Sequence, residues 1–105
     1  MAEFNWNDRV AEVKKRCDDW GREEYLDYID DIVGGLDREG VCAAHKIRPQ
    51  QLASAIGHVS ASVHGSRPVP AVEAGGWIGV DDETGVYTVN PDFAAAWKAA
   101  RPKKH

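Results

Sequence analysis

Cysteine, methionine and long apolar runs are all scarce in this chain of 105 residues. The two cysteines, Cys17 and Cys42, are too few for a disulfide framework, so we expect a reducing, cytoplasmic setting. No run approaches the roughly 20 apolar residues of a membrane span, and the acidic N-terminus is unlike a signal peptide. Positive charge is also short: the net charge of −4 argues against a protein that coats nucleic acid by charge alone.

The remaining composition is that of one folded domain spanning residues 1–105. Hydrophobic residues make up 43% of the chain and there are four tryptophans, which is typical of a globular protein rather than a disordered one. The charge is unevenly distributed. Residues 1–40 have a balance of −6, whereas residues 41–105 have a balance of +2 and contain all four histidines. The two halves are therefore expected to present different surfaces.

Apolar spacing predicts helices in the acidic half. Residues 7–20 carry apolar side chains at three- and four-residue intervals, after an asparagine that can cap the helix. Residues 22–37 carry a broader stripe and should form the central packing helix, weakened by Gly34 and Gly35 and ended by Gly40. The following stretch, 41–47, could pair as a short strand edge.

Two β-prone runs give the clearest local signal. Residues 77–80 and 86–89 are rich in branched and aromatic side chains, and the polar linker between them ends in glycine, which predicts a β-hairpin. Asn90, Pro91 and Asp92 then suit the start of a helix over 91–100. Residues 101–105 form a basic tail. The fold class predicted is mainly α with a small β-hairpin, that is, α+β.

The stretch PQQLASAIGHVSASVHGSRP, residues 49–68, resembles the helix-turn-helix pattern of DNA-binding proteins. Leu52 and Ile56 supply the apolar positions of the first helix, Gly57 the turn, and Val63 the apolar position of the second helix. Ser60 could cap that second helix. His58 and Ser66 depart from the pattern, because apolar residues are usual at both positions, and Gly65 and Pro68 shorten the second helix.

The order helix, short strand, helix, turn, helix and hairpin also resembles the winged-helix superfamily. The resemblance covers residues 22–90 and implies helices over 22–38, 49–57 and 60–74, with a wing over 77–89. The helices 7–20 and 91–100 would be additions to this winged-helix core. They could pair two subunits into a homodimer or close the core of the monomer, and the sequence leaves both options open.

DNA binding is the function that this resemblance implies, with the third helix in the major groove and the wing against the backbone or minor groove. Polar side chains with suitable donors surround the second and third helices. The candidate DNA-binding residues are Lys46, Arg48, Gln50, Gln51, Ser60, Ser62, His64, Ser66 and Arg67. A regulator of transcription or a DNA-accessory factor would use them, with no cofactor and no catalytic residue. The alternative for these residues is an ordinary solvated surface.

A protein-binding role is the competing interpretation, because the wing tip Asp81–Asp82–Glu83 is acidic where a phosphate-binding wing usually carries lysine or arginine. The acidic ridge of the N-terminal half could dock a basic partner, making the protein an adaptor or inhibitor that binds no DNA, or it could be a solvated face. The ridge consists of Asp18, Asp19, Glu23, Glu24, Asp27, Asp30 and Asp31.

Zinc binding and catalysis have weaker support. Cys42, His45, His58 and His64 are spaced C-x2-H-x12-H-x5-H, near the range of zinc fingers, yet the intervening segment lacks the aromatic and leucine positions of a finger. No paired nucleophile or phosphate-cradling glycine loop accompanies the carboxylates. We therefore predict neither a metal site nor an enzyme.

Overall fold

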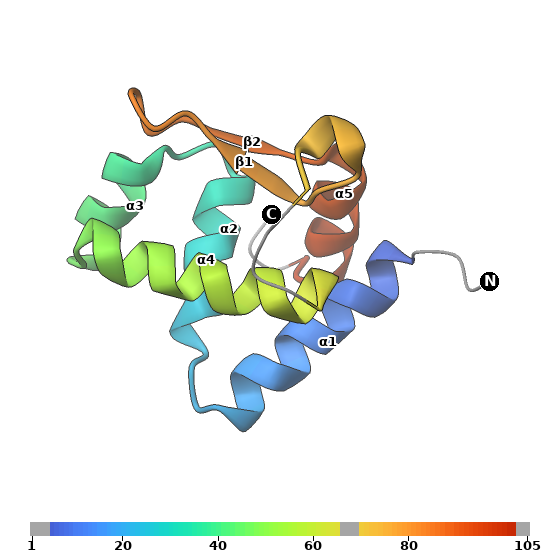
Figure 1. The fold of residues 1–105 in the computed structure, drawn as a ribbon. Coiled ribbons are helices and arrows are strands. Elements are labelled where there is room, and N and C mark those ends of the chain that lie inside the picture. Colours follow the sequence, from blue (N-terminus) through green and yellow to red (C-terminus); the bar gives the residue numbers. More distant parts are fainter. Residues whose placement is uncertain (1–4, 66–69, 103–105) are drawn as a thin grey trace.

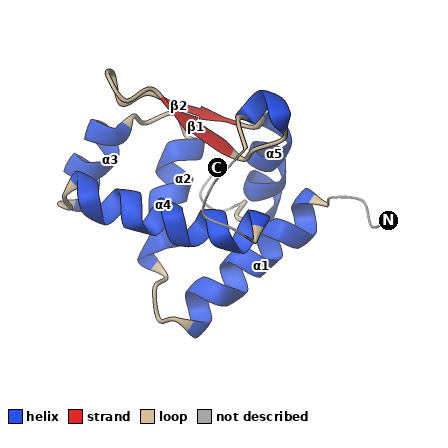
Figure 2. Cartoon of the chain, viewed as in Figure 1, coloured by secondary structure: helices blue, strands red, loops and turns tan. Residues whose placement is uncertain are grey.

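The computed structural model describes residues 5–65 and 70–102. In these ranges the chain is mainly helical, with a small two-stranded antiparallel sheet, as predicted (Figures 1 and 2). No helix there has the length and apolarity needed to cross a bilayer. The elements in order are α1 (Trp6–Asp19), α2 (Glu24–Val33), α3 (Arg38–His45), α4 (Pro49–His64), a 3-10 turn η1 (Val72–Ala74), β1 (Ile78–Val80), β2 (Tyr87–Val89) and α5 (Pro91–Ala100).

The two terminal helices start at asparagine caps, as their sequences predict. The Asn5 side chain accepts hydrogen bonds from the first-turn amides of α1, and the Asn90 side chain accepts one from the Asp92 N–H, 2.9 Å away. Each cap satisfies backbone N–H groups that have no partner within the helix. The local signals therefore place α1 and α5 within about one residue of the predicted bounds.

The single helix predicted over 22–37 is wrong, because the chain breaks after Val33. Gly35 adopts a φ of 107°, which glycine reaches without strain and a helix cannot accommodate. A new helix, α3, then begins at Arg38 and is capped by Asp37, whose side-chain oxygen accepts from the Gly40 N–H at 2.8 Å. The predicted strand edge over 41–47 is therefore also wrong, since most of that stretch belongs to α3.

The turn predicted at Gly57 does not form, and α4 runs unbroken through it. Leu52, Ala55, Val59 and Val63 continue one buried stripe along the helix, each with 1% or less of its surface exposed. Burial of that stripe outweighs the cost of a glycine inside a helix, which is about 1 kcal/mol. Residues 49–57 and 60–64 of the two expected helices thus belong to one helix, α4, which ends at His64. Of the remainder of the second expected helix, only Val72–Ala74 is helical among the described residues, as the 3-10 turn η1.

The hairpin forms where the sequence predicts it. Ile78 pairs with Val89, Gly79 with Thr88, and Val80 with Tyr87. Figure 1 shows the hairpin lying above α2 and α5, while α4 crosses the front of the molecule and α1 lies below.

Aromatic side chains of the hairpin and α5 form the centre of the core. Trp77, Phe93 and Trp97 have no exposed surface, and the Phe93 ring centroid lies 5.0 Å from that of Trp77 and 5.6 Å from that of Trp97. The apolar stripe of α1 packs against α4 and α5. The terminal helices therefore close the core of this single chain, although Trp20, at the end of α1, remains 43% exposed. Homodimer formation through these helices stays a prediction.

Candidate functional site

Helices α3 and α4 are joined by a tight three-residue turn, Lys46 to Arg48. Lys46 adopts the left-handed conformation, with φ 55° and ψ 46°, and no other non-glycine residue in the described ranges has a positive φ. The Ile47 N–H then donates to the Cys42 carbonyl at 3.0 Å, closing the end of α3. The Arg48 N–H donates to the side chain of Gln51 at 2.8 Å, which fixes the start of α4. The result is a compact helix-turn-helix unit, one helix earlier in the chain than the pattern predicted.

Four of the nine predicted DNA-binding residues lie together at this turn. Lys46, Arg48, Gln50 and Gln51 are all exposed, and they occupy the turn and the first turn of α4. Neither Lys46 nor Arg48 forms an ion pair with a described residue. The unpaired N–H groups at the start of a 16-residue helix add partial positive charge there. This end of α4 is therefore an exposed, donor-rich surface.

Beyond its first turn, α4 presents a smooth outward face. Gln50, Ser54, Gly57 and Ala61 recur at four- and three-residue intervals, and each is exposed or half-buried. No side chain after Gln50 on this face is longer than serine. Small side chains allow another molecule to approach the helix backbone closely.

Ser60 and Ser62 face the interior, so their predicted role in contacting DNA is wrong. Ser60 is 1% exposed, donates its hydroxyl to the Ile56 carbonyl at 2.7 Å and accepts from the Trp77 indole N–H at 2.9 Å. Ser62 is 4% exposed and donates to the His58 carbonyl at 3.1 Å. The unbroken helix rotates both serines inward, whereas a turn at Gly57 would have made Ser60 a cap.

His64 is half-buried and serves the fold. Its Nε2 accepts a hydrogen bond from the Trp77 backbone N–H at 3.2 Å, and its ring meets the edge of Trp6. Burial, together with the nearby Arg9, lowers the pKa of His64, so the neutral ring that can accept this bond is favoured. The last two predicted contacts, Ser66 and Arg67, lie outside the described residues.

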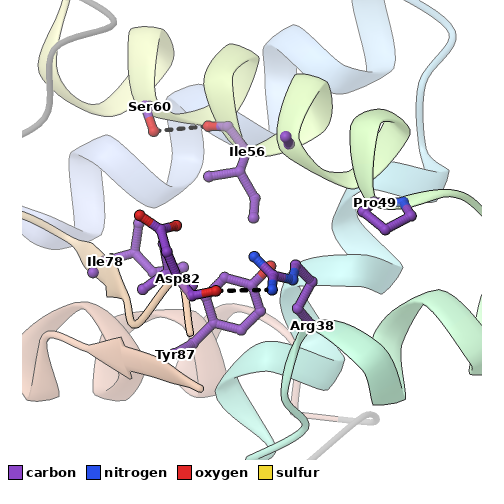
Figure 3. Close-up of a pocket in the computed structure, with 10 residues that line it drawn as sticks. Arg38, Pro49, Ile56, Ser60, Ile78, Asp82 and Tyr87 are labelled. Atoms are coloured by element: carbon purple, nitrogen blue, oxygen red, sulfur yellow. Dashed lines mark hydrogen bonds between the residues drawn. The ribbon is translucent and has the colours of Figure 1, made fainter. Parts of the chain in front are cut away.

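The hairpin loop between β1 and β2 is tethered to the start of α3 by one residue, Arg38. Its backbone N–H donates to the Gly85 carbonyl at 2.8 Å, and its Nη2 donates to the Asp82 carbonyl at 3.2 Å (Figure 3). Gly85 has a φ of 74°, and a Cβ there would lie 3.2 Å from the Arg38 Cβ. The chain therefore crosses Arg38 at close range, and the loop is held against α3.

An open apolar groove of about 290 Å³ runs between α4 and the hairpin. Figure 3 shows Ile56 and Pro49 on one side, Ile78 and Tyr87 on the other, and Arg38 at one end. Burial raises the pKa of Tyr87 to about 12, so its hydroxyl is protonated at neutral pH. The groove is lined by Arg38, Pro49, Ala53, Ile56, Ser60, Ile78, Gly79, Val80, Asp82 and Tyr87.

The groove is not among the sites predicted from the sequence. The predicted helices end at residues 37 or 38 and at 57, so Arg38 and Ile56 lie at helix ends there and share no predicted site. The signal that could have revealed it is the pair Ile78 and Val80, because alternating apolar residues on a short strand need a partner for their shared face.

The predicted acidic ridge divides into two parts. Asp18 and Asp19, in the last turn of α1, and Glu23, just before α2, are exposed near Trp20 in the sequence. Asp30 is instead buried, with 7% exposure, and pairs with Arg101, and the Asp31 Oδ2 lies 2.5 Å from the Nε2 of His45. A continuous solvated ridge of seven carboxylates is therefore wrong, because α2 turns two of its aspartates toward other helices.

The thiol and imidazole groups are dispersed. His45 contacts Asp31, and His58 stacks on Tyr25 with ring centroids 6.0 Å apart. Within residues 5–65 and 70–102, no three histidine, cysteine or acidic side chains lie close enough to hold a metal ion. Burial raises the pKa of the Cys17 thiol to about 11, so this cysteine is protonated and unreactive at neutral pH.

Comparison with known proteins gives no relative from which a role could be transferred. No family model, no curated protein and no solved structure matches this chain. The functional argument therefore depends on the residues themselves.

Proposed function

We propose that this chain is a cytoplasmic winged-helix protein that binds double-stranded DNA, as a regulator of transcription or an accessory factor, and that it is not an enzyme. The observation that carries the proposal is the cluster of Lys46, Arg48, Gln50 and Gln51 at the start of α4. These donors sit on a helix-turn-helix unit, α3–α4, that is preceded by α2 and followed by a hairpin. That order supports a winged-helix arrangement with α4 as the recognition helix.

The chemistry of the cluster suits a duplex. Gln50 can bond an adenine edge bidentately, whereas Arg48 can contact guanine or a phosphate. The Gln51 side-chain oxygen accepts from the Arg48 N–H, which leaves its NH₂ group to donate. Lys46 is exposed in the turn between α3 and α4, where its ammonium group could reach a phosphate. The small residues Ser54, Gly57 and Ala61 along the same helix would let α4 approach the floor of the major groove.

The wing does not bind phosphate in this proposal. Asp81, Asp82 and Glu83 are all exposed at its tip, and like charges would repel the DNA backbone. Arg38, the nearest cation, is tethered to the wing by its bond to the Asp82 carbonyl. DNA affinity therefore comes from the start of α4, and its salt dependence should be modest.

A gel shift on random-sequence duplex at low salt tests the proposal. Nonspecific DNA-binding proteins bind with dissociation constants on the order of 1–100 μM, so a shift within this range is expected. The duplex should be titrated at several salt concentrations, because genuine phosphate contacts weaken as salt rises. No shift at tens of micromolar protein would rule out DNA binding.

A protein adaptor is the second candidate, favoured by Trp20. This side chain is 43% exposed at the end of α1, and Asp18, Asp19 and Glu23 are exposed within three residues of it in the sequence. Tryptophan is common among residues that dominate binding energy at protein interfaces, and the acidic side chains would steer a basic partner. Two results together would support this role: no binding of DNA by the parent protein, and loss of binding to a basic protein partner in Trp20→Ala.

A further inference from the structure

The outer edge of β1 carries unpaired backbone groups. The Asn90 N–H donates to the Trp77 carbonyl and the Asp81 N–H to the Val86 carbonyl, each at 2.9 Å. In an antiparallel pair, hydrogen-bonded and non-hydrogen-bonded positions alternate. The N–H and C=O groups of Ile78 and Val80 therefore point away from β2. Along this edge, neither residue has a backbone partner within the described parts of the chain.

The apolar groove lies along this same edge. Three consecutive β1 residues, 78–80, line it, but only Tyr87 from β2 does. The opposite wall is α4, which contributes Ala53 and Ile56. The two edges of the hairpin differ. On the β2 side, the Gly85 carbonyl of the preceding loop accepts from the Arg38 N–H, whereas the β1 edge is open. An extended chain entering the groove would find an apolar wall and a row of backbone partners together.

The charges at the wing end of the groove select the entering chain. Asp82 and Arg38 are the charged residues of the lining, and Asp81 and Glu83 are exposed on either side of Asp82 in the same loop. Arg38 makes no ion pair with a described carboxylate, so the three acidic side chains are not neutralised by it. The surplus of negative charge favours a segment with lysine or arginine next to its apolar residues.

We infer that the groove between α4 and β1 is a peptide-binding site that accepts an extended, basic segment of a partner protein as a third strand on β1. Backbone hydrogen bonds to Ile78 and Val80 would supply affinity, as in other cases of strand addition. Alternate side chains would enter the groove over Ala53 and Ile56, and the basic residues between them would lie beside Asp82 and Glu83. Pro49 lines the groove next to the Lys46–Gln51 cluster, but none of the four residues proposed to contact DNA does, so the inference does not depend on DNA binding.

A blocked, fluorescein-labelled peptide of alternating valine and lysine, seven residues long, is the probe. We expect binding by fluorescence anisotropy and, on binding, slower hydrogen exchange of the Ile78 and Val80 amides. The same peptide with serine in place of valine tests the apolar contribution, and one with glutamate in place of lysine tests the charge. Both should bind at least tenfold more weakly.

Paired variants locate the site. Ala53→Gln should fill the groove and lower affinity at least tenfold, whereas Ala95→Gln, at an exposed alanine of α5, should leave it unchanged. Val80→Pro removes the Val80 N–H, one of the donors on the open edge, at a position where proline is tolerated in a sheet. It should also abolish the peptide-dependent protection of the Ile78 amide. Asp82→Asn with Glu83→Gln should weaken binding about fivefold, because exposed charge pairs contribute little each.

Three results would overturn the inference. The first is an absence of binding at millimolar peptide. The second is binding whose strength is the same in Ala53→Gln and Ala95→Gln. The third is protection of the Ile78 and Val80 amides that rises with protein concentration without peptide, because a second copy would then occupy the edge. Circular dichroism of each variant confirms that the fold is retained.

Discussion

Arg101 grips both carboxylate oxygens of Asp30, 71 residues earlier in the chain. Its Nε donates to the two oxygens at 2.8 and 3.0 Å, and its Nη2 donates to Oδ2 at 2.7 Å. The Trp97 indole N–H donates to the same carboxylate at 2.7 Å. Hydrogen bonding to Asp30 raises the pKa of Arg101 above its ordinary value, so the guanidinium stays charged. This contact fastens the end of α5 to α2.

Removing one member of this pair should destabilise the fold strongly. Asp30 is 7% exposed, so Arg101→Ala leaves a buried carboxylate with much of its charge uncompensated. The free energy of unfolding, measured by urea denaturation, should fall by about 3–5 kcal/mol. Arg16→Ala, at an exposed ion pair on α1, is the matched control and should cost less than about 1 kcal/mol. Equal losses for the two variants would contradict a buried role for Arg101.

Acidification should weaken the link between α4 and β1. The folded chain lowers the pKa of His64, mainly by burial, so the unfolded chain binds more protons below its ordinary value of 6.5. This contribution is therefore complete above about pH 6.5 and is lost as the pH falls below that value and through the lower pKa of the folded state. Urea unfolding midpoints between pH 8 and pH 5 should decline less in His64→Gln than in the parent protein. Parallel declines would show that His64 does not contribute.

Local signals explain which elements could be predicted from the sequence. The caps Asn5 and Asn90 and the two β-prone runs act over a few residues, and the structure has α1, α5 and the hairpin where they predict them. The pairing of Asp30 with Arg101 and the groove beside β1 join residues distant in sequence, which no local pattern specifies.

At Gly57, burial of the apolar stripe of α4 outweighs the tendency of glycine to end a helix. Glycine often ends a helix, and that rule predicted a turn here. The stripe Leu52, Ala55, Val59 and Val63 passes the glycine without a change of phase, and its burial requires a continuous helix. The error moved the predicted helix-turn-helix one helix along the chain and assigned Ser60 and Ser62 to the wrong face. The unbroken phase of the apolar residues on both sides of Gly57 is the sequence signal that favours a continuous helix.

Substitutions at Gly57, inside α4, and at Gly65, which caps its end, test whether the helix is continuous. Gly57→Ala should raise the free energy of unfolding by about 0.5–1 kcal/mol, because alanine favours a helix interior. Gly65→Ala should lower it by a similar amount, because Gly65 ends the helix with a φ of 76°. Thermal and urea unfolding of the two variants give opposite signs if α4 is continuous. Destabilisation by both would indicate a turn at Gly57 or a lack of space for its methyl group, which a crystal structure of the variant distinguishes.

The salt dependence of DNA affinity should change when Lys46 and Arg48 are removed. If Lys46 and Arg48 contact phosphates, replacing both by alanine should reduce the slope of log affinity against log salt by about two, one for each contact. Binding at low salt should weaken similarly for all duplex sequences, since phosphate contacts carry no sequence information. Lys98→Ala, an exposed lysine on α5, changes the net charge far from α4 and should leave the slope unaltered. Equal slopes for the parent protein and the double variant would mean that another face of the molecule holds the DNA.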